Sequence, residues 1–230
     1  MGTNRYWENG GRMHPSAARS WVIMGIVVFF CAAMVSAAAQ NSVGSAALDA
    51  SVEKFLNSRR SSWQDWNVPY QDGKVLHDLI VRKKYTRALE IGTSSGHSAI
   101  WIAWALSKTG GKLITIEIDA NLHKKAMQNF KAAGLEGYID ARLADAHDLI
   151  RELEGPFDFV FLDADKEWYT QYFKDLDPKL AKGGCFTAHN ASNAYAGIKE
   201  FLDYVRSRPG YQTSIDRSSS SGISISCKNE

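Results

Sequence analysis

RALEIGTSSG, at residues 87–96, is an apolar strand pattern that runs into a turn with two glycines and then into a helix starting near His97. Glycine lets the backbone approach a ligand closely, and the first turn of a helix presents free N–H groups. The glycine spacing differs from the Gly-x-Gly-x-x-Gly fingerprint that binds the pyrophosphate of a dinucleotide. Glu90 stands before the first glycine, where it suits a cationic group and would repel a phosphate. We therefore expect a ligand site here that is not a pyrophosphate site.

Strand and helix patterns alternate along the rest of the chain. Apolar runs of strand length, with helical patterns between them, occur at residues 88–91, 113–116, 138–143, 157–162 and 185–188. Two further strands, 211–216 and 222–227, follow without a helix between them and are joined by a serine-rich stretch. Alternating strands and helices with short connections favour right-handed crossovers and a parallel sheet. We expect an α/β fold: a doubly wound, mainly parallel seven-stranded sheet with helices on both faces and an antiparallel C-terminal hairpin.

The first 39 residues have the layout of a secretory signal peptide. Three arginines precede an uncharged, mostly apolar run at residues 21–35, and the small residues after it offer a cleavage site before Gln40. The run is short for a membrane span of about 20 residues, but extension to Ala39 nearly reaches that length. We predict a signal peptide or membrane anchor at 1–39 and a single domain at 40–230. The favoured location is periplasmic or secreted after cleavage, and the alternatives are a membrane-tethered domain and a soluble cytoplasmic protein.

Charge beyond residue 39 is balanced, because the positive excess of +2 comes from the leader. A neutral domain gives no electrostatic reason to expect a nucleic-acid partner. No internal repeat or linker divides this part of the sequence. We expect no nucleic acid, membrane contact only through an uncleaved N-terminal segment, and an oligomeric state that the sequence leaves open.

A second acid marks the tip of the next strand, which ends in Ile116-Glu117-Ile118-Asp119. A carboxylate at that position suits the two hydroxyls of a ribose, as it does in dinucleotide-binding folds. The alternative is that Glu90 and Glu117 are merely solvated strand ends. Two apolar strands that both stop at glutamate beside a glycine turn favour the binding interpretation.

Three motifs together resemble a known family. EIGTSSGHS (90–98), TIEID (115–119) and FVFLDADK (159–166) have the order and spacing of class I S-adenosylmethionine-dependent O-methyltransferases, specifically the catechol and caffeoyl-CoA O-methyltransferase group. The resemblance extends from about Trp63 to Cys227. It implies S-adenosylmethionine as the cofactor and a cofactor site made of Val68, Glu90, Gly92, Thr93, Gly96, Ser98, Glu117, Ile118, Asp145, Ala146 and Asp163.

The resemblance also implies a role for several of these residues. Glu90, Gly92 and Ser98 lie near the methionine part of the cofactor, Glu117 binds the ribose, and Val68 covers the bound molecule. Asp145 and Ala146 line the adenine pocket, and the neighbouring His147 is left to face solvent.

Polar residues follow the fourth and fifth strands, at the sheet edge where ligands bind in open α/β folds. The resemblance assigns a divalent metal to Asp163, His189 and Asn190 and the proton-accepting base to Lys166. Metal-dependent members carry Asp-Asn where this chain carries His189-Asn190. A neutral imidazole weakens Mg²⁺ binding and shifts the preference toward Mn²⁺, Zn²⁺ or Fe²⁺. A strand-end histidine without a metal and a surface lysine remain the alternatives.

Aromatic residues occur before the cofactor turn and after the strand tips, where they would suit a flat phenolic acceptor. The candidate substrate contacts are Trp66, Trp168 and Tyr195. The favoured function is methyl transfer to a hydroxyl of a small phenolic or catechol-like molecule, assisted by a divalent metal if the site binds one. One alternative is a catalytically silent cofactor-binding module of the same fold. Another is a nicotinamide-dependent oxidoreductase, whose phosphate-binding glycine pattern this sequence lacks.

Two cysteines, Cys185 and Cys227, remain beyond the leader. In the sheet of the resembling family, the last strand lies antiparallel beside the fifth, so the two thiols would face each other. An oxidising compartment would permit a disulfide, but regular strand pairing often leaves such pairs in poor geometry. We therefore favour two buried free thiols, with the disulfide as the alternative.

Overall fold

The computed structural model describes residues 1, 45–61, 63, 67–193 and 195–229. The chain divides into two compact units, Met1–Ala46 and Ala47–Glu230. The predicted leader, apart from Met1, and the candidate substrate contact Trp66 lie outside the described residues. None of the helices described is both long enough and apolar enough to span a membrane.

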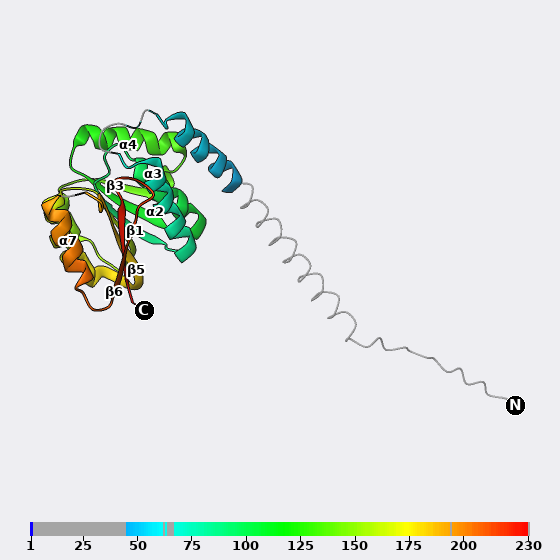
Figure 1. Cartoon of the computed structure of the whole chain (residues 1–230). Helices are drawn as coiled ribbons and strands as arrows, with labels where there is room; N and C mark the ends of the chain where they lie inside the picture. Colours follow the sequence, from blue (N-terminus) through cyan, green and yellow to red (C-terminus); the bar gives the residue numbers. More distant parts are fainter. Residues whose placement is uncertain (2–44, 62, 64–66, 194, 230) are drawn as a thin grey trace. The chain divides into compact units, whose positions relative to one another are not determined.

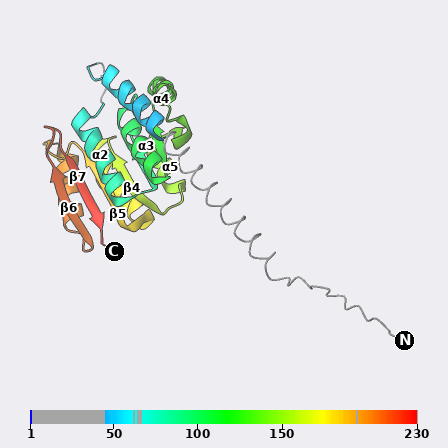
Figure 2. The same cartoon turned by 90° about the vertical axis from the view of Figure 1, so that its right-hand side faces the viewer.

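Seven strands in the described part of the chain form one sheet in the order β3-β2-β1-β4-β5-β7-β6 (Figures 1 and 2). Their bounds are β1 Arg87–Ile91, β2 Lys112–Glu117, β3 Ile139–Leu143, β4 Phe157–Leu162, β5 Leu180–His189, β6 Tyr211–Asp216 and β7 Ile223–Lys228. Neighbouring strands from β3 to β5 pair in parallel, whereas β7 pairs antiparallel with both β5 and β6. This arrangement confirms the predicted doubly wound sheet with its antiparallel C-terminal hairpin.

Helices cover both faces of the sheet, and the apolar side of each helix accounts for its position. In order these are a helix at residues 45–58, then α2 Tyr70–Lys83, α3 His97–Thr109, α4 Ala120–Ala133, α5 Ala146–Glu152, α6 Tyr169–Leu176 and α7 Ala196–Arg206. Short 3₁₀ turns occupy η1 Glu136–Tyr138, η2 Lys166–Trp168 and η3 Asp177–Lys179. In Figure 1, α2, α3 and α4 lie on one side of the sheet and α7 on the other.

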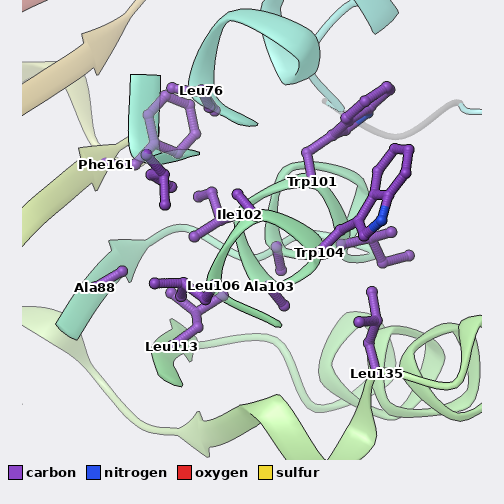
Figure 3. Close-up of a cluster of buried hydrophobic side chains, with 14 of the residues drawn as sticks. Leu76, Ala88, Trp101, Ile102, Ala103, Trp104, Leu106, Leu113, Leu135 and Phe161 are labelled. Atoms are coloured by element: carbon purple, nitrogen blue, oxygen red, sulfur yellow. The ribbon is translucent and has the colours of Figure 1, made fainter. Parts of the chain in front are cut away.

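Two apolar clusters result, one under each layer of helices. The first brings side chains of α2 and α3 against β1, β2 and β4, with Leu76, Ile102 and Leu113 among its fully buried members (Figure 3). The second packs Phe173 and Phe201 against the other face of the sheet. Every residue of α3 from His97 to Leu106 is buried, so the glycine turn that precedes α3 is anchored to the centre of the fold.

The fifth strand is longer than the sequence pattern indicated. We predicted residues 185–188, but β5 begins at Leu180. Phe157 of β4 pairs with Leu180, and Phe159 pairs with Cys185. Between these two pairs the chain advances by five residues in β5 but by only two in β4, so the pairing is irregular there. Gly183 lies in this stretch with a φ of 74°. The bulge hides the strand in the sequence because glycines interrupt the apolar alternation.

A disulfide joins Cys185 to Cys227. The two cysteines are directly opposite each other in the antiparallel pair of β5 and β7. Our preference for two free thiols was therefore wrong, and the alternative that we left open is the one observed. Strand register places the two sulfurs within bonding reach, which the sequence alone could not establish.

Candidate active site

The carboxyl ends of β1, β2, β4 and β5 meet at one edge of the sheet, and two cavities open there. The first has a volume of about 270 Å³ and the second about 380 Å³. Asp163 and Ala164, which follow β4, line both cavities. The two spaces therefore share a wall, and molecules bound in them would meet beside Asp163.

Gly92 and Ser94 of the glycine turn line the first cavity, whereas the predicted contacts Thr93 and Gly96 do not. Gly92 has a φ of 92°, and a Cβ added to it would collide with the backbone carbonyl of Asp163. Gly96 has a φ of 94° and precedes α3, where a Cβ would press on the ring of Phe130. Both predicted glycine positions therefore require glycine. Thr93 is buried, and its hydroxyl is bonded to the hydroxyl of Thr115, so its side chain supports the turn.

Glu90 is fully buried directly before the turn. Its Oε2 accepts a hydrogen bond from Thr115, and the nearby hydroxyl of Ser98 favours the ionised form of the carboxyl. Its Oε1 has no hydrogen-bond partner among the residues that the structure describes. Burial, reinforced by the nearby carboxylates Asp163 and Glu117, raises the pKa of Glu90 to about 8. A buried carboxyl with one unused oxygen is suited to a cationic ligand, which would restore its charge.

Glu117 lines the first cavity and is held in place by the backbone. Its Oε2 accepts from the N–H of Ser94 at 2.6 Å, and its Oε1 accepts from the N–H groups of Ile118 and Asp119 at 3.0 and 2.9 Å. A carboxylate has about four acceptor sites. Glu117 therefore keeps capacity for hydroxyl donors on a ligand while its orientation is fixed.

The far end of the first cavity contains Ile118, Asp145, Ala146, His147 and Tyr172. Asp145 caps α5 by accepting from the N–H of His147. The imidazole of His147 stacks on the ring of Tyr172, with centroids 5.5 Å apart and planes 7° apart. His147 was predicted to face solvent, but this stacking turns it into the cavity wall. A flat apolar group would fit between these side chains.

The second cavity brings together residues that we predicted from separate parts of the sequence: Lys166, His189, Asn190 and Tyr195. Its wall also includes Asn67, Pro69 and Ser221, which sequence reasoning missed. Those three come from a loop before α2 and from the turn between β6 and β7, and no local pattern connects them to the strand tips.

Trp168, predicted to contact the substrate, and Val68, predicted to cover the cofactor, have different neighbours in the structure. Trp168 packs against His147, with ring centroids 4.0 Å apart, and against Tyr172, so it supports the wall of the first cavity from behind these two rings. Val68 is buried in the apolar core, and its carbonyl lies 2.8 Å from Nδ1 of His97. Val68, predicted to cover the cofactor, does not line the first cavity, and Trp168, predicted to contact the substrate, does not line the second.

A network of four charged residues, which we call the His189 network, borders the second cavity: Asp72, Asp163, Lys166 and His189. Nδ1 of His189 lies 3.0 Å from Oδ2 of Asp163, and its Nε2 lies 2.8 Å from Oδ2 of Asp72. Nζ of Lys166 donates to Oδ1 of Asp163 at 2.7 Å and to the carbonyl of Ala164 at 3.0 Å. Asp72 was missed because an acid in the first turn of an amphipathic helix resembles an ordinary surface residue.

The charges in the network shift one another's pKa values. Burial alone would lower the pKa of His189, but hydrogen bonds and charges from Asp163 and Asp72 outweigh it and raise the pKa to about 9. Burial alone would raise the pKa of Asp163, but His189 and Lys166 outweigh it and the net pKa is lowered. These two shifts favour an ionised Asp163 beside a protonated His189 near neutral pH.

The class of protein follows from the fold and from this edge of the sheet. A doubly wound sheet with an acid-glycine turn at β1, a carboxylate at the tip of β2 and an antiparallel C-terminal hairpin is a Rossmann-like methyltransferase fold. A family model described as O-methyltransferase matches residues 42–197. The chain belongs to the O-methyltransferase family, as the three sequence motifs predicted.

Individual proteins give the same result. A catechol O-methyltransferase of Niastella koreensis is 40% identical over 112 residues, which cover 47% of this chain and 50% of that protein. A flavonoid 3',5'-methyltransferase of Vitis vinifera is 29% identical over 168 residues, 69% of each chain. The match to the first of these thus spans about half of that relative's length. The crystal structure of the O-methyltransferase TomG from Streptomyces achromogenes with SAM superposes with a TM-score of 0.67 at 25% identity, over 78% of this chain and 90% of that one.

Proposed function

We propose that this protein transfers a methyl group from S-adenosylmethionine to a hydroxyl of a small phenolic or catechol-like acceptor. The observation that supports this most directly is the pair of cavities that share Asp163, one bordered by cofactor-type carboxylates and the other by Lys166. Relatives named for catechol and flavonoid methylation, and a SAM complex of similar fold, agree with it.

The first cavity fits the cofactor part by part. Glu90 does not itself line this cavity, but it directly precedes the lining residues Ile91 and Gly92. Its buried Oε1, which lacks a partner in the described chain, suits the ammonium of the methionine portion. The fixed carboxylate of Glu117 suits the two ribose hydroxyls. The stacked rings of His147 and Tyr172, with Ile118 and Ala146, suit the flat adenine. These contacts would direct the sulfonium methyl toward Asp163 and the second cavity.

The chemistry in the second cavity is a displacement at the methyl carbon. The acceptor oxygen forms a bond to that carbon as the carbon–sulfur bond breaks, and S-adenosylhomocysteine leaves. Lys166 rests as an ammonium paired with Asp163 at 2.7 Å. After it loses a proton to solvent, its neutral amine takes the proton of the acceptor hydroxyl, and the ammonium that re-forms is again stabilised by Asp163. Asn190 and Tyr195 border the same cavity and would orient the acceptor.

The predicted metal site does not fit the side chains observed. Both ring nitrogens of His189 are directed at carboxylates, and the ammonium of Lys166 occupies the other oxygen of Asp163. Among the described residues, no cluster of three or more His, Cys, Asp and Glu side chains is arranged to hold a metal ion. The mechanism above therefore uses only protein side chains and the cofactor.

Transfer assays decide between this function and a silent binding module. A catechol panel with labelled S-adenosylmethionine should give methylated product, detected by mass spectrometry. Cofactor binding without any product would instead favour the silent module. A nicotinamide cofactor would need a Gly-x-Gly-x-x-Gly pattern, which the turn at residues 92–96 lacks, and Glu90 before that turn would repel a phosphate.

The cofactor site predicts a pH dependence of binding. An ammonium pairs with ionised Glu90, but the pKa of about 8 keeps that carboxyl mostly protonated below neutral pH. Binding between pH 5 and 7 should therefore release about one proton, and affinity should rise up to about tenfold per pH unit. Calorimetry of S-adenosylhomocysteine in buffers of different ionisation enthalpy measures the released proton. In Glu90→Gln the release should vanish, and its persistence would contradict the assignment.

The ribose contact predicts a second loss of affinity. Glu117→Ala removes charge-assisted hydrogen bonds worth about 1.5–3 kcal/mol each. Cofactor binding should weaken by at least about tenfold, since 1.4 kcal/mol corresponds to that factor. The exposed Glu136 on η1 provides the matched control, because Glu136→Ala removes an acid outside the cavity. Equal calorimetric affinities for the two variants would argue against a role of Glu117 in binding.

We also propose that the domain is exported, either cleaved after residue 39 or tethered by that segment. The Cys185–Cys227 disulfide supports an oxidising compartment, and the N-terminal sequence supports transfer across a membrane. Fractionation of cells that make the full chain, with N-terminal sequencing of the product, tests both statements.

A further inference from the structure

His189 makes a pair of contacts that a neutral imidazole cannot make favourably. Its two ring nitrogens lie 3.0 and 2.8 Å from oxygens of Asp163 and Asp72. A neutral ring carries one N–H, so its other nitrogen would direct a lone pair at a carboxylate. An imidazolium donates to both. The two contacts therefore occupy both ring nitrogens of His189 and leave neither of them for a metal ion.

The site around His189 is shielded from solvent, and its positive and negative charges already balance. The side chain is 6% exposed, and those of Asp72 and Asp163 are 1% and 11% exposed. The two carboxylates are matched by His189 and Lys166. A divalent ion placed among these groups would meet two cations and would have to displace hydrogen bonds from buried carboxylates, which is costly.

Asp72 fixes this arrangement through the Nε2 side of the His189 ring. It lies on α2, 117 residues away from His189 in sequence. The hydroxyl of Ser219, in the turn between β6 and β7, donates to the same Oδ2 at 2.7 Å. Oδ1 of Asp72 has no hydrogen-bond partner in the described residues. A buried carboxylate in this position needs a cation, and His189 supplies it.

We propose that the His189 side chain replaces a divalent metal ion in this site, so that methyl transfer proceeds without one. His189 is a positioning residue: it neutralises Asp72 and Asp163 while Lys166 and Asn190 remain in the cavity wall to hold the acceptor oxygens. This inference rests on the proposed function for its catalytic part only. The claim that no ion binds can be tested separately from activity.

The first test is a calorimetric titration of the EDTA-dialysed full chain with MnCl₂. The wild type should bind no ion, and binding of one Mn²⁺ per chain would overturn the proposal. Long-range ¹H–¹⁵N NMR of the same protein should show both ring nitrogens of His189 protonated at neutral pH. A ring with one unprotonated nitrogen would also overturn it.

A double variant tests whether replacing His189 creates a metal site, which a purely structural role of His189 would not predict. The double variant Asp72→Asn/His189→Asp places a carboxylate next to Asp163 and Asn190 and removes the buried charge opposite. Once its fold is verified by circular dichroism, it should bind one Mn²⁺. The matched double variant Asp148→Asn/His123→Asp changes the same residue types outside both cavities and should bind none. If the folded Asp72→Asn/His189→Asp protein does not bind Mn²⁺, the proposal that His189 takes the place of a metal ion is contradicted.

Activity distinguishes the two proposals. With an acceptor that is methylated, the wild-type rate should be the same in EDTA as in Mg²⁺, Mn²⁺ or Zn²⁺, and a rate that requires an added ion would overturn the inference. If no acceptor in the panel is methylated, the proposed function fails. The Mn²⁺ titration and the NMR measurement still decide whether His189 stands in for a metal.

Discussion

Replacing Lys166 by methionine should lower the rate of methyl transfer by about 10²- to 10⁴-fold, the range that a positioned acid or base contributes. Lys166 is the side chain in the second cavity that can accept a proton and remain paired with Asp163 afterwards. Methionine keeps the length and the apolar stem but removes the nitrogen. Single-turnover assays with saturating cofactor measure the loss directly.

Two comparisons make the Lys166 result specific. Lys199→Met removes an exposed lysine from α7 and should leave the rate unchanged. Cofactor affinity in Lys166→Met should change little, since Lys166 is not part of the wall of the first cavity. A Lys166→Met protein that transfers methyl groups at the wild-type rate would remove Lys166 from the mechanism.

Reduction of the Cys185–Cys227 disulfide should lower the free energy of unfolding by about 4 kcal/mol. The bond closes a loop with a sequence separation of 42 residues, and the chain-entropy model gives that value for a loop of this length. For a domain of this size the melting temperature should fall by about 10 °C. Urea unfolding with and without reducing agent measures the difference without changing any side chain.

The double variant Cys185→Ala/Cys227→Ala controls for the reducing agent. It should be insensitive to reductant and close in stability to the reduced wild type. Cys185 is fully buried beside the hydroxyl of Tyr85, so the substitution also removes packing and a small additional loss is expected. Equal stability of the oxidised and reduced wild type would show that the bond does not constrain the unfolded chain.

The sequence predicted those features that depend on residues close together in the chain. Glu90 and Glu117 were identified because each stands at the end of an apolar strand, and parallel strands present their carboxyl ends at one edge. The predicted strand bounds agree with the structure to within one residue except in β5, where a bulge interrupts the apolar pattern, and α3 begins at His97 as expected. Lys166 and His189 were found for the same reason, at adjacent strand tips.

The parts that the sequence did not predict depend on contacts between distant segments. Asp72 is distinguished only by its buried contact with His189, and Ser219 only by its hydrogen bond to Asp72. The assignment of His189 as a metal ligand considered its neighbours in sequence and could not include a carboxylate on α2. His147 was assigned to solvent because stacking on Tyr172 depends on how α5 and α6 pack.

The walls of the two cavities differ in where they come from in the chain. All residues lining the first cavity lie between Ile91 and Tyr172, in the central βα units. The second cavity adds Asn67, Pro69, Tyr195 and Ser221, which precede α2, precede α7 or form the C-terminal turn. Evolution can therefore exchange these outer loops and alter which acceptor enters, while the inherited machinery for holding the methyl donor is left intact.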